Sequence, residues 1–360
     1  MSDEISTGTS FGTFEQQDKV VVGLSGGVDS SVCIRILREQ GFDVRAAVIR
    51  FSPAHDKAVA AAVKVAQQLT VPLTIEDCTQ QFEHDVIAPF CAAYCSGVTP
   101  SPCVLCNPLV KFRALANVAD RFGIRYIASG HYAHIAEANG VFHVQKALSA
   151  ARDQSYMLYR LPQDILARLC LPLGEFEKDD IRAMAAEAGL ASADAPDSQE
   201  ICFIPDGNYA AYLAARGLTS AQGHFFGPKG EDLGPHKGVL HYTVGQRKGL
   251  KLAYGEPVFI KRIRENGDIQ LALAGEEFYS GVLVHELVRT DGAPYRAGEH
   301  FLVKVRSRAV PAPCVIACAE NGTVTVRFET PQRAPAPGQS AVFYDGESVI
   351  GGGIIADMLD

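Results

Sequence analysis

The sequence lacks an apolar stretch long enough to cross a lipid bilayer, which would take about 18 consecutive apolar residues. Its start also lacks the basic and apolar regions of a secretory signal peptide. These absences exclude a membrane-spanning protein and predict a cytoplasmic one without a membrane partner. Ser and Thr dominate the start instead, and we expect residues 1–17 to form a flexible tail.

Positive charge is also in short supply, since 33 Lys and Arg residues stand against 41 Asp and Glu residues, for a formal net charge of -8. Binding to nucleic-acid phosphates draws on Lys and Arg, so the total argues weakly against such a partner. Each basic cluster, taken alone, is more typical of solvated surface charge. A local basic face could override the total, and the candidates are residues 246–251, residues 261–264 and the group Lys304, Arg306 and Arg308.

A disulfide framework is a further feature that we expect to be missing, although the chain has 10 cysteines. Without a secretion signal these thiols should stay mostly reduced, as buried or reactive groups. The composition, with 47% hydrophobic and 21% charged residues, is that of an ordinary soluble globular protein. A length of 360 residues predicts two or three domains.

Strands and helices alternate between residue 19 and about residue 203, which is the pattern of a parallel sheet covered by helices. Gly41 closes the first helix, and Asn107 followed by Pro108 can begin the last one. We therefore expect an α/β domain with a doubly wound parallel sheet and ligands at the carboxyl ends of its strands. The expected strands are 20–24, 44–51, 73–77 and 125–130, and the expected helices are 29–40, 56–69, 80–94 and one beginning at 107.

The composition and the hydrophobic pattern of the sequence change after Asp206. Glycine and proline become frequent there, and short stretches of alternating apolar and polar residues, typical of strands, replace the helical pattern. Turn signals such as Asn321-Gly322 separate these strands. We expect the α/β domain over 18–205, a small β-rich central domain over 206–284 and a C-terminal β-barrel over 285–360. The expected strands are 258–263, 269–274, 301–306, 314–318, 323–328 and 340–344.

A glycine-rich run between the first strand and the first helix has the features of a phosphate-binding loop. Backbone N–H groups in such a turn can surround an anion, and the helix dipole adds to the attraction. The run has the form of a PP-loop, typical of enzymes that split ATP into adenylate and pyrophosphate, and lacks the Walker A pattern. Its hydroxyls can donate to phosphate, and Asp29 can bind Mg2+ or cap the helix. The run consists of Gly23, Leu24, Ser25, Gly26, Gly27, Val28, Asp29, Ser30 and Ser31.

The same run contains G-x-S-x-G, the nucleophile elbow of α/β-hydrolases, in the same strand-turn-helix context. In that interpretation Ser25 is the nucleophile and His131 is its base. The PP-loop interpretation is favoured, because the first strand is an unusual place for the elbow and because an elbow does not need repeated hydroxyls.

Cysteines supply the second group of candidate residues. Cys103 and Cys106 form a C-x-x-C pair in a proline-rich loop, directly before the helix expected at Asn107. Such a pair can be a redox dithiol, half of a zinc site or part of an iron-sulfur site. Cys202 stands where the α/β pattern ends, and a lone thiol is more often packed in the core.

Taken together, the motifs resemble those of the tRNA-specific 2-thiouridylases, the MnmA family, over nearly the whole chain after the tail. The resemblance implies ATP-dependent 2-thiolation of the wobble uridine of tRNA, through adenylation of the C2 oxygen of uridine. It also implies three domains that together clamp the anticodon arm. The matching motifs are GLSGGVDSSV from Gly23, TPSPCVLCNPLVKF from Thr99, SGHYA from Ser129, RDQSYMLYRL from Arg152, DSQEICFI from Asp197, VGQRKGL from Val244, PGQSAVFYDGE and GGGII.

The resemblance further implies a role for each matching residue. ATP should lie on the glycine-rich run, with Ile49 and Gly130 beside the nucleotide. A persulfide should form on Cys202 with Cys106 as its catalytic partner, and a cysteine desulfurase or sulfur-relay protein should donate the sulfur. A helix beginning just after Cys106 would lower the pKa of its thiol. Ser101, Pro102 and Cys103 should face the target base, and the residues that should touch tRNA are His131, Arg152, Asp153, Gln154, Arg306, Ser307 and Gln339.

One departure from the family pattern concerns sulfur transfer. The family has Asp three residues before the catalytic cysteine, whereas this chain has Cys103. Together Cys103, Cys106 and Cys202 can hold a 4Fe-4S cluster whose remaining iron binds an exogenous sulfur. The cluster and the persulfide stay open as alternatives, while structural zinc lacks an evident fourth ligand. The smaller departures are Arg152 in place of Lys, Ser307 in place of an aromatic residue and His134 in place of Arg.

Two other classes of function stay open at this point. A different PP-loop enzyme, such as an amide-forming ligase, would share the ATP site but would not need Cys106 and Cys202. A pure RNA-binding module would leave the phosphate loop without a role.

Overall fold

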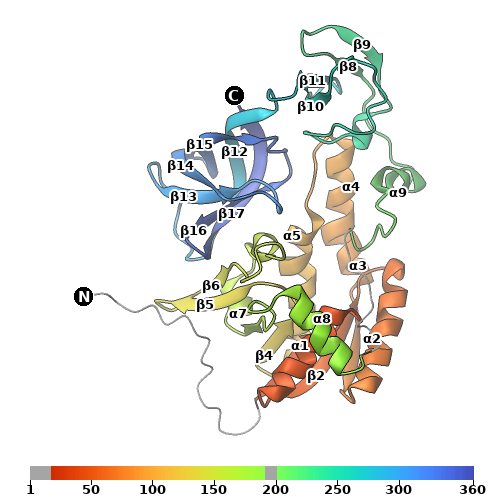
Figure 1. The fold of residues 1–360 in the computed structure, drawn as a ribbon, viewed down its shortest axis with the longest axis vertical. Helices are drawn as coiled ribbons and strands as arrows, with labels where there is room; N and C mark the ends of the chain where they lie inside the picture. Colours follow the sequence, from red (N-terminus) through yellow and green to blue (C-terminus); the bar gives the residue numbers. More distant parts are fainter. Residues whose placement is uncertain (1–17, 191–200) are drawn as a thin grey trace.

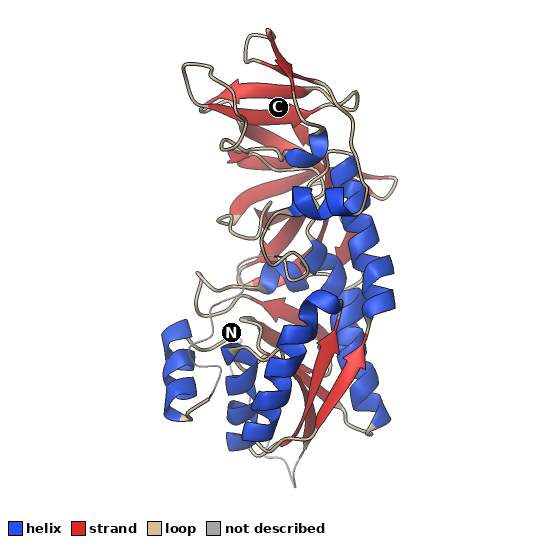
Figure 2. Ribbon diagram, turned by 90° about the vertical axis from the view of Figure 1, so that its right-hand side faces the viewer, coloured by secondary structure: helices blue, strands red, loops and turns tan. Residues whose placement is uncertain are grey.

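The computed structural model describes residues 18–190 and 201–360, so the tail expected over residues 1–17 lies outside the described residues. The molecule is elongated (Figures 1 and 2). An α/β domain forms one end, and a small middle domain and a β-barrel lie toward the other. In the described part of the chain, no helix combines the length and the apolar character that a membrane crossing needs.

A five-stranded parallel sheet in the order β3-β2-β1-β4-β7 forms the centre of the N-terminal domain. Val20, Val21 and Val22 of the central strand β1 have no exposed surface, because apolar clusters cover both faces of the sheet. This is the α/β fold that the alternating pattern predicted. The strands are β1 (Lys19–Gly23), β2 (Asp43–Arg50), β3 (Leu73–Asp77), β4 (Tyr126–Ser129) and β7 (Leu169–Cys170).

Helices from both halves of the N-terminal domain cover the sheet. On one face of the sheet, α1 (Val28–Glu39), α2 (Asp56–Gln68) and α8 (Lys178–Glu187) contribute side chains to a common apolar core. On the opposite face, α6 (Phe112–Arg121) does so. Gly41 ends the first helix as expected, with a φ of +92° that favours glycine. The shorter helical elements are η1 (Pro53–His55), η4 (Ser155–Leu158), α7 (Gln163–Leu166), α9 (Tyr209–Ala215) and η5 (Val239–His241).

Two helices differ from the prediction. The stretch expected as one helix over 80–94 is α3 (Thr79–Phe82), a π-helical turn η2 (Glu83–Ile87) and α4 (Ala88–Cys95). The helix expected to begin at Asn107 begins at Pro102 instead, and it runs through α5 (Pro102–Cys106), a π-helical turn η3 (Asn107–Lys111) and α6.

The earlier start has a local cause. Pro102 suits the first position of a helix, whereas the Asn107 amide donates to the carbonyl oxygen of Met157 at 2.9 Å and does not cap a helix. The C-x-x-C pair therefore lies inside a helix, and the prediction that it lies in a loop was wrong.

The middle domain has a four-stranded sheet in the order β10-β11-β8-β9, and the C-terminal strands form a barrel in the order β12-β15-β14-β13-β16-β17. Pairing of β17 with β12 closes the barrel. The strands expected here are confirmed to within a few residues, except that β14 and β15 run longer. They are β10 (Val258–Ile263), β11 (Ile269–Leu273), β13 (His300–Lys304), β14 (Ala312–Glu320), β15 (Thr323–Arg333) and β16 (Ser340–Asp345). The two short strands β8 (His224–Phe226) and β9 (Asp232–Pro235) of the middle domain were not predicted.

Four strands of the barrel sheet were not predicted. Register shifts interrupt the pairing of β12 with β17, so neither alternates regularly between apolar and polar residues. β17 also contains consecutive glycines, and a Cβ at Gly352 would lie 2.4 Å from the carbonyl oxygen of Ala341 on the neighbouring strand. The strands are β12 (Phe278–Arg289), β17 (Ser348–Leu359) and the hairpin of β5 (His134–Ala138) and β6 (Val141–Gln145), which continues the barrel sheet.

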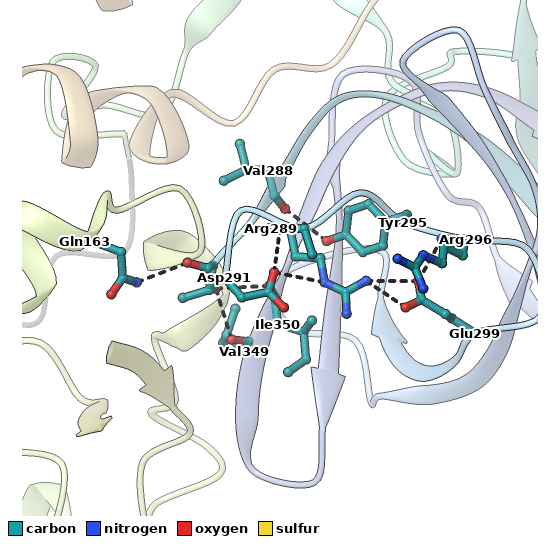
Figure 3. A network of polar contacts seen from close by, with 11 residues as sticks. Gln163, Val288, Arg289, Asp291, Tyr295, Arg296, Glu299, Val349 and Ile350 are labelled. Carbon is teal, nitrogen blue, oxygen red and sulfur yellow. Dashed lines mark hydrogen bonds and ion pairs between the residues drawn. The ribbon is translucent and has the colours of Figure 1, made fainter. Parts of the chain in front are cut away.

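Buried polar contacts fasten the barrel to the N-terminal domain. Lys304 on β13 pairs with Asp153 at 3.3 Å, and their side chains are only 7% and 4% exposed. Figure 3 shows a second contact, where Gln163 of α7 reaches the polar network around Arg289 of the barrel and donates to the carbonyl oxygen of Thr290 at 3.2 Å. Arg289 also lines a hollow of about 560 Å³ on the barrel, which contains none of the predicted site residues.

Candidate active site

The phosphate loop connects β1 to α1, at the carboxyl end of the central strand of the parallel sheet. Its serines bond within the loop. Ser25 Oγ lies 3.1 Å from Ser30 Oγ, and Ser31 Oγ donates to the carbonyl oxygen of Gly27 at 2.8 Å. These bonds hold the first turn of the helix in the conformation that presents backbone N–H groups to an anion.

Gly26 is the position in this loop where only glycine fits. It has a φ of +82°, and a Cβ there would lie 2.7 Å from the Cβ of Ala61 on α2. Leu24 and Val28 are buried beneath the loop, so the loop presents its backbone and Ser25 to solvent. The close packing of α2 therefore requires glycine at this position.

The carboxylate of Asp29, which was expected to bind Mg2+ or cap the helix, has two partners in this structure. Lys178 at the start of α8 forms an ion pair with it, and the Tyr132 hydroxyl donates to Oδ1 at 2.8 Å. A capping box of Glu177 and Asp180 fixes the first turn of α8 and so the backbone of Lys178. A cation therefore stands beside the phosphate loop.

The two predicted neighbours of the nucleotide come from the strands that flank β1. Ile49 lies near the carboxyl end of β2, and Gly130 directly follows β4. A Cβ at Gly130 would lie 3.0 Å from the carbonyl carbon of Asp29 and 3.1 Å from the backbone nitrogen of Ser30. The end of β4 thus touches the phosphate loop.

His131 follows Gly130 and is buried, with both ring nitrogens in contact with neighbours. Nδ1 lies 2.8 Å from Ser129 Oγ, and Nε2 lies 3.4 Å from Lys111 Nζ. Because a lysine ammonium can only donate, Nε2 must accept and Nδ1 carries the proton that is donated to Ser129. Burial and then the charge of Lys111 lower the pKa of His131 well below its usual value, which agrees with a neutral ring.

This arrangement does not support the hydrolase interpretation. A nucleophile elbow needs a base within hydrogen-bond reach of the serine. Ser25 Oγ contacts Ser30, whereas the nitrogens of His131 contact Ser129 and Lys111.

The predicted thiols share one cation, Lys111, which the sequence analysis did not single out. Its charge acts on each of the thiols Cys103, Cys106 and Cys202. Lys111 closes the π-helical turn η3, in which a residue bonds with the one five positions away, and its backbone N–H bonds with the Cys106 sulfur. We call these three cysteines and Lys111 the thiol site.

Desolvation has the largest effect on the pKa values of the groups in the thiol site. It raises the pKa of Cys106, with the nearby Cys202 adding to the effect, and it raises the pKa of Cys202 to about 12. The expected lowering of the Cys106 pKa by a helix start was therefore wrong, because Cys106 lies at the end of α5 and the chain continues as helix beyond it. Lys111 opposes the rise at each thiol and is itself desolvated, which lowers the pKa of its ammonium.

Cys202 is placed by the residue that follows it. Phe203 is 4% exposed and packs edge to face against Phe82 of α3 and Phe90 of α4, with ring centroids 5.6 Å and 5.1 Å apart. Cys202 itself reaches solvent, as does Cys103. The residues of the motif before it, Asp197 to Glu200, lie outside the described residues.

The arrangement of the thiols bears on the iron-sulfur alternative. Over residues 18–190 and 201–360, no three His, Cys, Asp or Glu side chains are grouped so that they could hold a metal ion. Cys103, Cys106 and Cys202 are near enough to feel the same charge, but they do not converge as ligands of one metal centre.

Comparison with known proteins places this site in a family. The model described as the tRNA methyl transferase HUP domain matches residues 18–206, and those of the tRNA methyl transferase PRC-barrel domain and the aminomethyltransferase beta-barrel domain match residues 211–269 and 280–355. The tRNA-specific 2-thiouridylase MnmA of Lachnoclostridium phytofermentans is 39% identical over 353 residues, which cover 94% of this chain and 99% of the relative. That of Acetivibrio thermocellus is 41% identical over 354 residues, with the same two coverages. The chain belongs to the MnmA family.

Membership of the MnmA family confirms the resemblance seen in the motifs. Among solved structures, a 4-thiouridine synthetase in complex with RNA and ATP is 18% identical and covers 55% of this chain and 50% of that chain. Its TM-score is 0.35.

Several residues that the MnmA resemblance places at tRNA are bonded within this protein. Gln154 accepts from the backbone N–H of Tyr132 at 2.9 Å, and Asp153 forms the buried pair with Lys304. The Arg306 guanidinium donates to the carbonyl oxygens of Val244, in the middle domain, and Ala334, in the barrel. Desolvation lowers the pKa of Arg306. Asp153 and Arg306 thus join domains in this structure, whereas Gln154 bonds within the N-terminal domain. Arg152 and Ser307 are partly exposed.

Proposed function

We propose that this protein catalyses the ATP-dependent 2-thiolation of the wobble uridine of tRNA. The observation that supports this most directly is the position of Gly130 and His131. Gly130 packs against the phosphate loop, and the next residue, His131, contacts Lys111 of the thiol site. Adjacent residues thus link a site suited to ATP with a site suited to sulfur. Methyl transfer, named in the description of the family model, would need neither.

The first half-reaction activates uridine. Its C2 oxygen attacks the α phosphorus of ATP, pyrophosphate leaves, and the oxygen becomes part of an adenylate leaving group. The N–H groups of the loop, the dipole of α1 and the ammonium of Lys178 would stabilise the phosphate charge. Mg2+ would neutralise further charge, and Asp29 is the residue to hold it once its carboxylate exchanges Lys178 for the ion.

The second half-reaction brings in sulfur. The terminal sulfur of a persulfide on Cys202 bonds to C2, and AMP leaves with the former uridine oxygen. The Cys106 thiolate then attacks the Cys202 sulfur, which releases 2-thiouridine and leaves a disulfide between the two cysteines. An external thiol reduces this disulfide, and a cysteine desulfurase or sulfur-relay protein renews the persulfide. Lys111 would stabilise the thiolates.

A 4Fe-4S cluster on Cys103, Cys106 and Cys202 is the alternative route for sulfur. It fits less well, because these thiols are not grouped as ligands of one metal centre. Anaerobic purification followed by iron and sulfide analysis tests it. An active, iron-free enzyme removes the cluster, whereas loss of both iron and activity in Cys103→Asp would favour it over the persulfide.

The tRNA would be held by its anticodon arm, with Ser101, Pro102 and Cys103 at the start of α5 facing the target base. Because the formal net charge of the chain is -8, its Lys and Arg residues would have to be concentrated on the side that binds tRNA. Such an enzyme would work in the cytoplasm, where tRNA is modified.

Incubation of the protein with ATP, Mg2+, a sulfur source and unmodified tRNA tests the proposal. We expect 2-thiouridine in the digested tRNA and pyrophosphate in equal amount. Neither product with a correctly folded protein would rule the proposal out. Pyrophosphate without 2-thiouridine would support the ATP site but not the thiol site.

A further inference from the structure

The segment that carries the thiols toward the site is held by both accessory domains. It runs from the end of α4 to Pro102 at the start of α5. On one side the middle domain contacts it, because Gly97 has a φ of +72° and a Cβ there would lie 2.7 Å from Ile263 Cγ2 on β10. In Figure 1, α4 runs from the N-terminal domain toward the middle domain, which places this segment between them.

On the other side, residues 336–339 of the barrel form a clasp on the same segment. The Thr99 N–H donates to the carbonyl oxygen of Pro337 at 2.9 Å, and the Gln339 amide donates to the carbonyl oxygen of Thr99 at 3.0 Å. Gly338 has a φ of +87°, and a Cβ there would lie 2.3 Å from Val98 Cγ1. We call residues 336–339 the barrel clasp.

The barrel clasp is itself anchored on both sides. Gly338 N–H donates to the carbonyl oxygen of Ile355, and Ile355 N–H donates to that of Gln339, at 2.9 Å and 2.8 Å. The next residue, Ser340, exchanges two hydrogen bonds with the hydroxyl of the buried Tyr156, at 2.9 Å and 3.0 Å. A clasp so fixed can impose its position on the segment that it holds.

We propose that Gly338 and Gln339 are positioning residues that set the place of the α5 thiols in the active site. This inference rests on the proposed function and assigns the barrel a part in sulfur transfer besides any contact with RNA. The Gln339 amide also lies 3.4 Å from the carbonyl oxygen of Pro100, and Ser101 alone separates Pro100 from the helix. A shift of the clasped segment therefore moves Cys103 and Cys106 with it.

The two possible roles of Gln339 predict different kinetics. A residue that binds tRNA changes the KM for tRNA, whereas a residue that positions a reacting group changes kcat. We expect Gln339→Ala to lower kcat about tenfold and to leave the KM for tRNA unchanged. A tenfold change corresponds to the loss of one hydrogen bond, near the upper end of the free energy that such a bond contributes. The matched control is Gln332→Ala, because the Gln332 amide donates to the carbonyl oxygen of Thr330 within the barrel. A raised KM with unchanged kcat would overturn the proposal.

Gly338→Ala tests the clasp by steric means. The new methyl group must displace Val98, and we expect kcat to fall on the order of 10²-fold, because small misplacements of reacting groups cost that much. Gly346→Ala in the same barrel is the control, since Gly346 also has a positive φ, +55°, but a Cβ there meets nothing within 4 Å. Adding Val98→Ala to Gly338→Ala should restore part of the rate. An equal fall of kcat in Gly338→Ala and Gly346→Ala would show that the effect comes from backbone strain in the barrel and would overturn the proposal.

A readout without ATP or tRNA separates this inference from the proposed function. We expect iodoacetamide to modify Cys106, which is only partly exposed, about tenfold faster in Gln339→Ala and Gly338→Ala than in the wild type, since release of a local contact increases access. Mass spectrometry of the peptide that contains Cys106 measures the rate. Unchanged rates in both variants would overturn the inference even if the enzyme makes 2-thiouridine, and changed rates would support it even if the activity assay fails.

Discussion

Lys178 and Asp29 form an ion pair across the phosphate loop, with Lys178 Nζ 2.7 Å from Oδ1 and 2.9 Å from Oδ2 of the carboxylate. The Lys178 side chain is only 7% exposed. The pair joins α8 to the first turn of α1, although the residues are far apart in the sequence. It thus holds a cation beside the loop that the phosphates of ATP should occupy.

We expect Lys178→Met to lower the rate of tRNA-dependent pyrophosphate release by about 10²-fold, the usual cost of losing a preorganised charge in an active site. The KM for tRNA should not change. Lys64→Met is the control, because Lys64 is an exposed lysine on the neighbouring α2. Pyrophosphate release at the wild-type rate in Lys178→Met would show that the ammonium has no part in the ATP reaction.

Gly26→Ala should abolish nucleotide binding, because the methyl group would collide with Ala61 and the backbone of α2. A positive φ adds roughly 1 kcal/mol or more of strain for alanine. Gly41→Ala separates the two effects, since Gly41 has a φ of +92° and a Cβ there meets nothing within 4 Å. Equilibrium binding of an ATP analogue measures the result. Similar affinities in both variants would contradict the tight packing of the loop.

Cys106→Ser and Cys202→Ser should each eliminate 2-thiouridine and preserve tRNA-dependent pyrophosphate release, because in the proposed mechanism the thiols act only after uridine is adenylated. Cys318→Ser is the control, since Cys318 lies on β14 of the barrel. Liquid chromatography with mass spectrometry of digested tRNA gives the product. Thiolation by either active-site variant would remove the persulfide route as written.

Thiol reactivity should rise with pH. A raised pKa keeps Cys202 protonated at neutral pH, so its thiolate fraction grows about tenfold for each unit between about pH 7 and about pH 9. Alkylation of the Cys202 peptide should follow this slope, and Lys111→Met should slow it further by removing the cation that favours the thiolate. A plateau reached below about pH 8 would mean that Cys202 is not desolvated as described.

Local patterns in the sequence predicted much of the fold. The alternation of strands and helices and the glycine-rich run gave the parallel sheet and the place of the phosphate loop, because each depends on neighbouring residues. The strands β12 and β17 escaped prediction, since bulges and glycines such as Gly352 obscure their alternation. The hairpin of β5 and β6 joins the barrel sheet through contacts that no local pattern encodes.

The candidate site likewise has features that local motifs predicted and features that depend on the tertiary structure. Motifs predicted the loop and the cysteines, whereas Lys111 comes beside the thiols through a π-helical turn and Lys178 comes beside the loop through the packing of α8 on α1. The sequence signal for Lys111 was its position in the same motif as Cys106. The pKa of Cys106 was predicted in the wrong direction, because burial of its sulfur depends on the tertiary structure.

The most direct test of the account is the fate of oxygen during thiolation in water enriched in oxygen-18. If the C2 oxygen of uridine attacks the α phosphorus of ATP, AMP takes its new oxygen from the tRNA and stays unlabelled, in equal amount with 2-thiouridine. Oxygen-18 in AMP at that stoichiometry would show that water attacks ATP instead, and would contradict activation of uridine by adenylation.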